Sequence, residues 1–485
     1  MTTERMSLVD TAWLRMDSPV NLMMIVGIWL FEPGLPHAAL RERLRDKLLP
    51  YARFRQKVVH EALGAAWVED DDFDLDRHLV RERLVRQRGR SQREALQARA
   101  SELAVTPLDP DHPLWQFHLV ERYEGGSALI LRIHHCIADG IALVALLMSI
   151  ADGGAGLPAH AVPHAPAHAD DEGDWLADAV VRPLAGAVVE AIDVGGEAVA
   201  ASLRALAAPQ RLLAQAARLA RSGTRIVRDA AALALLSDDS KTRLKGPLAG
   251  TKVVAWCEPV PLDVVKAVSK ALGCSLNDVL LACVANAIGD YLRDEGEDPA
   301  GKEIRAMVPV NLRPPEQAWQ LGNRFGLAPV TLPIGIANPV ECVYAVRQRM
   351  GELKNSYQPL LAYALLGVSG AITKPLQDAL SDLFLKKTTA VMTNVPGPAQ
   401  PIRLCGSTLR QSIVWVPSSG NVGFGVSIVS YAGGVQFGLI TDSARCPDPQ
   451  RIIDRFAPQF ERLLLLALML PWAPERPAAP VRRAR

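Results

Sequence analysis

The feature that most constrains the fold is the run "SALILRIHHCIADGIALVALLMSI" at residues 127–150. Its first part, residues 127–133, has the length and alternation of a strand, and its last part, residues 141–150, has the continuous apolar character of a buried helix. Between these parts lie the residues with titratable or turn-forming chemistry, which are His134, His135, Asp139 and Gly140. The run therefore predicts a strand, a polar loop and a helix, with two imidazoles and a carboxylate held at the end of a core strand.

Length and composition allow a large core and exclude one class of partner. The chain has 485 residues, of which 49% are hydrophobic, and this length favours two or three domains. Lys and Arg total 53 against 52 Asp and Glu, which gives a formal charge of +1. Because this balance produces no strong field for nucleic acid, we expect no nucleic-acid partner.

The ends of the chain and its cysteines indicate a cytoplasmic protein. The start, "MTTERMSLVD", lacks the charged-then-apolar pattern of a secretory signal. The longest fully apolar stretches, such as residues 463–472, are shorter than the roughly 20 residues that cross a bilayer as a helix. The seven cysteines are scattered without a C-x-x-C pair, which indicates free thiols rather than a disulfide frame or a zinc site. Such a protein can still touch a membrane surface.

Residues 1–152 form the first predicted domain, which mixes strand and helix patterns. The stretch at residues 22–31 is typical of a buried strand, and residues 114–123 alternate as a strand does. We expect residues 114–123 to form a hairpin with residues 127–133, because Glu124-Gly125-Gly126 supplies the turn between them.

Residues 153–245 are predicted to join two domains, as a mobile linker followed by an Ala-rich helical connector. The linker contains His160, His164 and His168, but their spacing of four in a Pro-broken stretch argues against one rigid metal site. Residues 175–236 place arginines on a largely apolar helical ladder. This pattern fits an ordinary surface helix with a solvated basic face, and it also fits an interfacial helix lying on lipid.

Residues 246–472 form the second predicted domain, in which strand and helix signals resume. The helix that follows Ser275 has this residue as a good N-cap. The tail at residues 473–485, rich in Pro, Ala and Arg, is predicted to be disordered. The pattern as a whole predicts an α/β (α+β) protein with two domains of comparable size joined by a long helical connector.

The chemistry available to this chain points to a histidine base. All ten histidines lie at or before residue 168, so such a base must come from the N-terminal half, where His134 and His135 are best placed. Successive side chains of a strand point to opposite faces, so only one of the two can face a given channel. Neutral imidazole suits the removal of a proton from an alcohol that attacks a carbonyl. The chain has neither a G-x-S-x-G elbow nor an H-E-x-x-H zinc helix, so transfer from a thioester without metal or protein nucleophile fits best.

A structural interpretation of the same residues competes with this one. A histidine at a strand end is usually structural, and Asp139 could simply cap the helix that follows. However, H-H-x-x-x-D-G fixes four residues at once, and its chance appearance in a chain of this length is roughly one in a thousand. We therefore favour the functional interpretation.

With these residues in place, the sequence resembles the bacterial wax ester synthase/acyl-CoA:diacylglycerol acyltransferase family of the chloramphenicol-acetyltransferase-like superfamily. The resemblance covers nearly the whole chain, and "HHCIADG" alone indicates only the superfamily. The blocks specific to the family are Pro113-Leu114-Trp115, "TRLKGPLAGTKVVAW", the Asn277-Asp278 pair, "VPVNLR" with Arg313, "GNRFG", "TNVPGP" with Asn394, and "GLITD". The resemblance implies two chloramphenicol-acetyltransferase-like domains, each a mixed sheet with flanking helices, and an active-site tunnel at their interface.

The resemblance also implies a mechanism. His135 would be the general base that deprotonates a fatty alcohol or diacylglycerol, and His134 would support the loop. Asp139 would hold the loop through an arginine, for which Arg313 is the candidate. Asn277 and Asp278 would shape the site between the domains, together with substrate-site residues Gly140, Trp115 and Asn394. Acyl-CoA would be a substrate, with no cofactor and no metal, and a membrane or lipid-droplet surface would be a partner.

Two positions depart from the pattern of the family. Ile25 stands where the family's N-terminal block usually has a histidine, and Lys245 stands where another block usually has asparagine. These departures bear on acceptor choice, so two alternatives stay open. One is a related O-acyltransferase with another acceptor or a carrier-protein donor. The other is a lipid-binding or lipid-droplet coat protein that has lost catalysis.

Overall fold

The computed structural model describes the two predicted domains but not the segment between them. The described residues are 3–154 and 237–470, apart from 62–63, 86–87, 314–320, 355, 357, 372–373, 375–376 and 379–386. The predicted linker from residue 155 onward, the Ala-rich stretch at 175–236 and the predicted disordered tail therefore lie outside the described residues.

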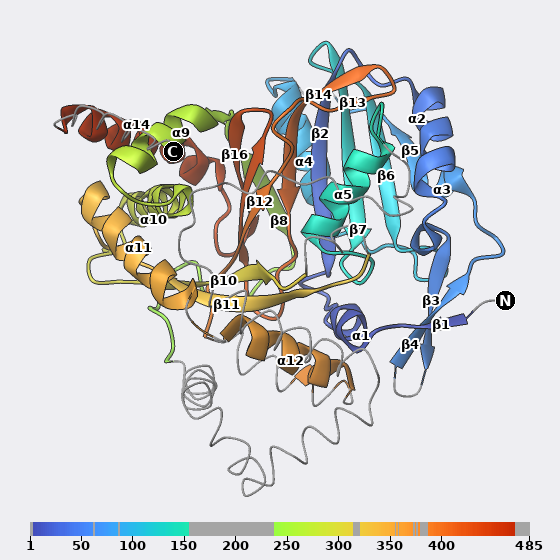
Figure 1. Ribbon diagram of the computed structural model, residues 1–485, viewed down its shortest axis with the longest axis horizontal. Coiled ribbons are helices and arrows are strands. Elements are labelled where there is room, and N and C mark those ends of the chain that lie inside the picture. Colours follow the sequence, from blue (N-terminus) through green and yellow to red (C-terminus); the bar gives the residue numbers. More distant parts are fainter. Residues whose placement is uncertain are drawn as a thin grey trace, which may run out of the picture.

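A six-stranded sheet forms the centre of the first half of the molecule (Figure 1). Its strands, in spatial order, are β13 (Arg403–Leu404), β14 (Ser407–Trp415), β2 (Met24–Glu32), β7 (Gly126–His134), β6 (Trp115–Tyr123) and β5 (Leu79–Glu82). The predicted hairpin is confirmed, because β6 and β7 pair in antiparallel fashion. Its turn residues Glu124 and Gly125 both have positive φ, at 47° and 82°, as a two-residue hairpin turn with matching twist requires.

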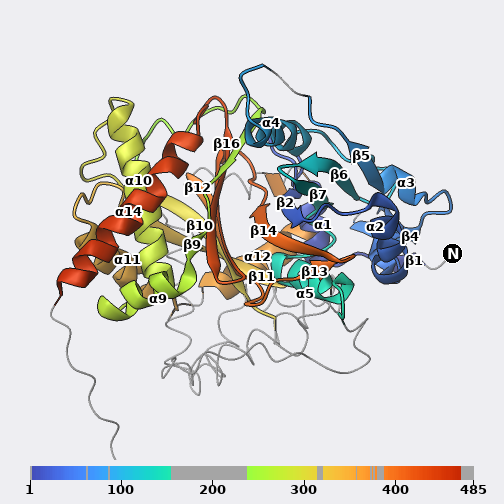
Figure 2. The ribbon, with the colours of Figure 1, turned by 90° about the horizontal axis from the view of Figure 1, so that it is seen from above.

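Both faces of this sheet are covered, which explains why every residue of β7 is buried. Helix α4 (Gln92–Ala104) lies on one face and α5 (Gly140–Ile150) on the other, as Figure 2 shows from above. Leu129, Leu131 and Ile133 pack on the α5 side, whereas Ala128 and Ile130 pack on the α4 side. This alternation within an apolar strand is what a sheet buried on both faces requires.

The remaining elements of this half are α1 (Leu8–Arg15), α2 (His37–Arg43), α3 (Leu75–His78), the π-helical turn Leu44–Leu48, the 3-10 turn Ala52–Phe54, and a small sheet of β1 (Thr3–Arg5), β4 (Gly64–Glu69) and β3 (Gln56–Glu61).

A seven-stranded mixed sheet forms the centre of the second half. Its strands are β11 (Phe325–Leu332), β10 (Ile304–Asn311), β12 (Ala390–Pro396), β15 (Phe424–Tyr431), β16 (Gly434–Asp442) and β8 (Lys252–Trp256), with β9 (Val260–Pro261) paired to β16. Helices α9 (Leu262–Ala271), α10 (Leu276–Asp294), α11 (Pro339–Lys354) and α14 (Gln450–Met469) cover its outer side (Figure 2). The predicted N-cap of α10 is confirmed, because Ser275 accepts a hydrogen bond from the backbone of Asp278.

Among the described residues no single helix is long and apolar enough to cross a membrane. The bent pair of α9 and α10 meets the length and composition of a membrane span, by these two criteria alone.

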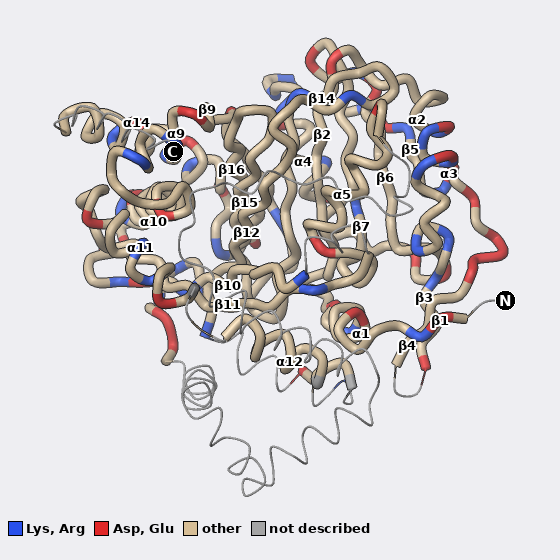
Figure 3. Tube along the Cα trace, viewed as in Figure 1, with Lys and Arg blue, Asp and Glu red and all other residues tan. Residues whose placement is uncertain are grey.

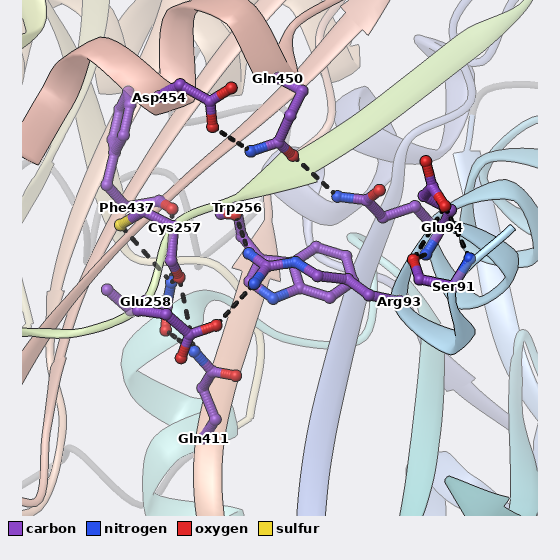
Figure 4. A network of polar contacts seen from close by, with 12 residues as sticks. Ser91, Arg93, Glu94, Trp256, Cys257, Glu258, Gln411, Phe437, Gln450 and Asp454 are labelled. Carbon is purple, nitrogen blue, oxygen red and sulfur yellow. Dashed lines mark hydrogen bonds and ion pairs between the residues drawn. The ribbon is translucent and has the colours of Figure 1, made fainter. Parts of the chain in front are cut away.

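Strands of the second half cross into the sheet of the first. β14 pairs in antiparallel fashion with β2, although more than 370 residues separate Thr408 from its partner Glu32. Polar contacts reinforce the junction where α4 meets β8 (Figure 4). Arg93 of α4 is 2.5 Å from the Glu258 carboxylate and also donates to the carbonyl of Trp256. The two sheets are therefore tied together by backbone pairing as well as by side chains, which the strand patterns did not predict.

Helix α1 connects the halves on the other side of the molecule, where it packs against α12 (Gln358–Ala371). A Cβ placed on Gly370 of α12 would lie 1.8 Å from the carbonyl oxygen of Leu8, so glycine is required for this close approach. Most charged residues lie on outer helices and loops rather than on the central strands (Figure 3). The central region between the two halves is accordingly left for apolar packing and for the few polar groups described next.

Candidate active site

The two histidines lie at the end of β7 and have different surroundings. Each is 4% exposed. The backbone N–H of His135 donates to the carbonyl of Met23 on the adjacent strand segment, over 2.7 Å. The side chain of His134 points into the loop, where its Nδ1 accepts the backbone N–H of Cys136 at 3.1 Å and its Nε2 lies 3.3 Å from Asp17 Oδ2. These contacts suit the supporting role expected for His134.

The His135 ring lies between two aromatic side chains. It stacks on Trp13 of α1 with ring centroids 4.5 Å apart and planes 17° from parallel. Phe325 of β11 approaches the same ring at a centroid distance of 5.5 Å. Trp13 belongs to the first half and Phe325 to the second, so the imidazole is held where the two halves meet.

A cavity of about 300 Å³ opens beside this imidazole. Its volume is at the lower end of the range of about 300–1,000 Å³ that is usual for small-molecule sites. The first half contributes Trp13, His135 and residues 139–141 to its wall. The second half contributes residues of β10, β11, β12 and the segment after β14, which are Pro309, Asn311, Phe325, Leu327, Val391, Thr393, Asn394, Val395, Pro396, Val416 and Pro417. Most of the wall is apolar, so the cavity favours apolar groups and disfavours water.

Burial also sets the protonation state of His135. Removal from water lowers the pKa of His135 to about 4, an effect that the nearby Asp139 carboxylate partly opposes. The imidazole is therefore neutral near pH 7 and can accept a proton. Its Nδ1 is buried without a hydrogen-bond partner among the described residues.

Asp139 both caps a helix and pairs with an arginine, which are the two roles that the sequence analysis considered for it. Its Oδ1 accepts the backbone N–H of Ala142 at 3.0 Å and so caps α5. Both of its oxygens also face Arg313, at 3.1 Å and 3.0 Å from the two terminal guanidinium nitrogens. The backbone N–H of Arg324 donates to Oδ2 at 3.1 Å. The predicted pairing with Arg313 is thus present, and it joins the histidine loop to the connection between β10 and β11.

The other predicted site residues separate into two groups. Gly140 and Asn394 line the cavity. Asn277 is exposed and accepts a hydrogen bond from Asn394, so it reaches the cavity only through that residue. Asp278 instead forms a capping box with Ser275 at the start of α10, and it does not line the cavity.

Trp115 also lies away from the cavity. It is buried in the core of the first half, where its indole N–H donates to the carbonyl of Phe54 at 3.0 Å and its ring stacks on His78. Trp115 therefore supports β6, the neighbour of β7, rather than the substrate space.

Ile25 and Lys245, the two departures from the family pattern, do not line the cavity either. Ile25 is buried in β2 opposite Ile133, and Lys245 pairs with Asp239.

Sequence reasoning missed the residues that surround the imidazole. Trp13 and Phe325 contact the ring, and Asn323 donates a hydrogen bond to the carbonyl of His135 over 2.7 Å. Phe325 and Asn323 belong to "GNRFG", a block that had been noted without a role for its residues. Trp13 carried no signal, because one aromatic residue on a short amphipathic helix is most simply explained as core.

Comparison with known proteins agrees with this geometry. Residues 6–280 match the wax ester synthase/diacylglycerol acyltransferase catalytic domain, and residues 321–464 match the C-terminal domain of the same family. A Mycobacterium tuberculosis protein named as a probable diacylglycerol O-acyltransferase is 27% identical over 449 residues, which cover 90% of each chain. A second such protein of M. tuberculosis is 28% identical over 465 residues, covering 92% of this chain and 95% of the relative.

Solved structures show the same fold. The wax ester synthase/diacylglycerol acyltransferase from Marinobacter aquaeolei VT8 superposes with a TM-score of 0.64 at 21% identity, covering 96% of this chain and all of that one. The first condensation domain of the calcium-dependent antibiotic synthetase superposes with a TM-score of 0.58 at 16% identity, covering 96% and 97% of the two chains. The family models therefore define an acyltransferase, and the solved structures show that it shares its fold with condensation domains. Among acyltransferases, the chain belongs to the wax ester synthase/diacylglycerol acyltransferase family.

The ion pair between Asp139 and Arg313 yields a stability prediction. The side chain of Arg313 is 0% exposed and that of Asp139 is 6% exposed, so Arg313→Ala would leave an uncompensated buried carboxylate. We expect the free energy of unfolding to fall by about 3–5 kcal/mol, measured by urea denaturation. The control is Arg81→Ala, which removes a pair with Glu121 in which the Arg81 side chain is 62% exposed. That change should have little effect, and equal losses in the two variants would contradict the importance of the buried pair.

Proposed function

We propose that this chain transfers a long-chain acyl group from acyl-CoA to a fatty alcohol, to diacylglycerol, or to both. The observation that carries the proposal is the neutral, buried imidazole of His135 at the wall of an apolar cavity between the two halves. Family membership and the diacylglycerol acyltransferase relatives support the choice of substrates. Long acyl chains also match the apolar wall, because burying each methylene of a substrate there is favourable by about 0.8 kcal/mol.

In the proposed mechanism, Nε2 of His135 takes the proton of the acceptor hydroxyl as its oxygen attacks the thioester carbonyl carbon. The resulting tetrahedral intermediate collapses with cleavage of the carbon–sulfur bond. The imidazolium then returns the proton to the departing thiolate, and CoA leaves as the free thiol. No bond to the protein forms at any stage, and the proposed reaction uses neither a cofactor nor a metal ion.

The surroundings of His135 assist this chemistry in two ways. The apolar wall disfavours water, which would otherwise compete with the alcohol and hydrolyse the thioester. The burial that keeps His135 neutral also makes it a weak base, so the imidazolium that forms needs a compensating charge. The Asp139 carboxylate acts in that direction, because it raises the pKa of His135 against the larger effect of burial.

Loss of the proposed base should abolish turnover. We expect wild-type protein to release thiol from palmitoyl-CoA in the presence of hexadecanol or dipalmitoylglycerol, and His135→Ala to lower kcat by about 10²–10⁴-fold. The matched control is His60→Ala on β3, an exposed histidine outside the cavity wall, which should keep wild-type activity. Full activity in His135→Ala would reject the role of the base.

The same assay separates the alternatives. Weak release with both lipid acceptors but strong release with another alcohol, or with a carrier-protein donor, would indicate a related O-acyltransferase. Tight binding to lipid droplets with no turnover of any donor would indicate a catalytically silent lipid-binding protein.

The pH dependence of the reaction follows from the pKa of His135, which burial lowers to about 4. The base acts when neutral, so a lowered pKa moves the loss of activity to lower pH. We expect kcat/KM to stay level from pH 8 down to about 5.5 and to fall only toward pH 4, whereas an imidazole in water would titrate near 6.5. Burial also raises the pKa of Asp10 to about 6, which lies within the pH range of this experiment. Asp10→Asn removes this second titration and therefore serves as a control. A half-loss near pH 6.5 in both proteins would contradict the prediction.

We further propose that the protein is cytoplasmic and meets its acceptors at a membrane or lipid-droplet surface, because fatty alcohols and diacylglycerol are insoluble in water. The proposed contact is the Ala-rich stretch at residues 175–236, and it rests on the pattern of arginines on an apolar ladder. Deletion of this stretch, in a variant that keeps its unfolding transition, should reduce flotation with phosphatidylglycerol-containing liposomes. Unchanged flotation would assign the contact elsewhere.

A further inference from the structure

Several buried polar atoms around the cavity, including Trp13 Nε1, have no hydrogen-bond partner among the described residues, and two of these atoms are complementary. These two atoms are Nδ1 of His135 and Oδ1 of Asn323, and each of these residues is 4% exposed. An unsatisfied buried polar group costs about 1–3 kcal/mol, so each such group calls for an explanation. Here one atom can be a donor and the other is an acceptor, and the two residues are already in contact.

The orientation of the Asn323 amide is fixed by its neighbours. Its Nδ2 donates to Asp10 Oδ1 over 2.7 Å and to the carbonyl oxygen of His135 over 2.7 Å. A flipped amide would place an oxygen against these two acceptors and would lose both hydrogen bonds. Oδ1 of Asn323 is therefore identified as the acceptor that remains free on a side chain already bound to His135.

Helix α1 holds both partners in position. Asp10 Oδ1 accepts the backbone N–H of Asn323 at 3.1 Å as well as the amide, and Asp10 is only 8% exposed. Trp13 lies one turn further along α1 and stacks on the His135 ring, which limits the rotation of that ring. Asp10 thus orients Asn323 while Trp13 orients the imidazole.

The protonation chemistry of His135 requires such a partner. A neutral imidazole is a donor at one nitrogen and an acceptor at the other. For Nε2 to take a proton from the acceptor alcohol, Nδ1 must carry the hydrogen, and burial keeps that hydrogen from water. Burial is the main influence and lowers the pKa of His135, whereas Asp139, the backbone carbonyl of His135 itself and, to a smaller extent, the Asn323 side chain act to raise it.

We propose that Asn323 is the positioning residue that selects the tautomer of His135, by accepting a hydrogen bond from Nδ1–H through its Oδ1, and that Asp10 holds Asn323 for this task. The three residues form a relay, Asp10–Asn323–His135, in which only His135 touches the reacting atoms. The role of Nε2 as the base rests on the proposed function, whereas the tautomer itself does not.

The first test reads the tautomer directly, in the full chain without substrate. Nitrogen-15 NMR of protein labelled at histidine distinguishes a protonated Nδ1 from a protonated Nε2, and the His135 signals are those that vanish in His135→Gln. We expect wild type at pH 7 to carry the hydrogen on Nδ1, and Asn323→Ala to populate both tautomers. A hydrogen on Nε2 in wild type, or an unchanged tautomer in Asn323→Ala, would overturn the proposal.

The second test uses a matched pair of variants at Asp10. An asparagine there can accept the same hydrogen bonds from Asn323 through its own oxygen, so Asp10→Asn should keep the tautomer and most of kcat. Asp10→Ala should mix the tautomers and lower kcat by about tenfold or more, with little change in KM for acyl-CoA, which is a smaller loss than the ~10²–10⁴-fold for removal of the base. Equal behaviour of the two variants would count against the relay.

These readouts keep the two proposals apart. If no acceptor supports thiol release but the tautomer responds to Asn323 as expected, acyl transfer is rejected and the relay stands. If thiol release depends on His135 but the tautomer ignores Asn323, the relay is rejected and acyl transfer stands. Should Asn323→Ala fail to fold, the wild-type tautomer and the Asp10 pair still decide the question.

Discussion

The Asp139 carboxylate is the interaction on which the arrangement of the site depends. A buried carboxylate is costly to desolvate, and its cost is offset only when nearly all of its acceptor positions are used. Here they are used by the backbone of α5, by both terminal nitrogens of Arg313 and by the backbone of Arg324. One side chain thereby ends the histidine loop, begins a helix and binds the second half of the molecule to the first.

The cavity depends on this junction because neither half forms it alone. Strand β14 extends the first sheet, and the segment that follows it returns to the cavity wall as Val416 and Pro417. Helix α1 brings Trp13 to the imidazole while it packs against α12 of the second half. The apolar enclosure that results keeps His135 neutral, and it leaves Nδ1 of His135 buried without a hydrogen-bond partner among the described residues.

Much of the local structure and part of the site could be predicted from sequence. The hairpin of β6 and β7 has an alternating pattern and a Glu-Gly turn, and α10 begins at a serine with an aspartate three residues later, so local rules suffice. Arg313 was predicted as the partner of Asp139 from a family block rather than from spacing. Asp278 and Trp115 belong to equally visible blocks, yet one caps a helix and the other fills a core. A motif therefore marked an important position without telling whether the position touches the cavity.

The sequence by itself determined which groups are available for chemistry: a histidine pair at the end of a core strand and an aspartate that starts the next helix. It contains neither of the nucleophile and zinc motifs that would favour another reaction. The tertiary structure decided which other side chains contact these residues. Residues 13, 135 and 323 are separated by more than 100 positions from one to the next, yet they converge on one imidazole. Periodicity and capping are properties of a few neighbouring residues, whereas such convergence depends on how two sheets and α1 pack. For that reason the candidate base could be chosen from the chain, and the contacts around its imidazole could not.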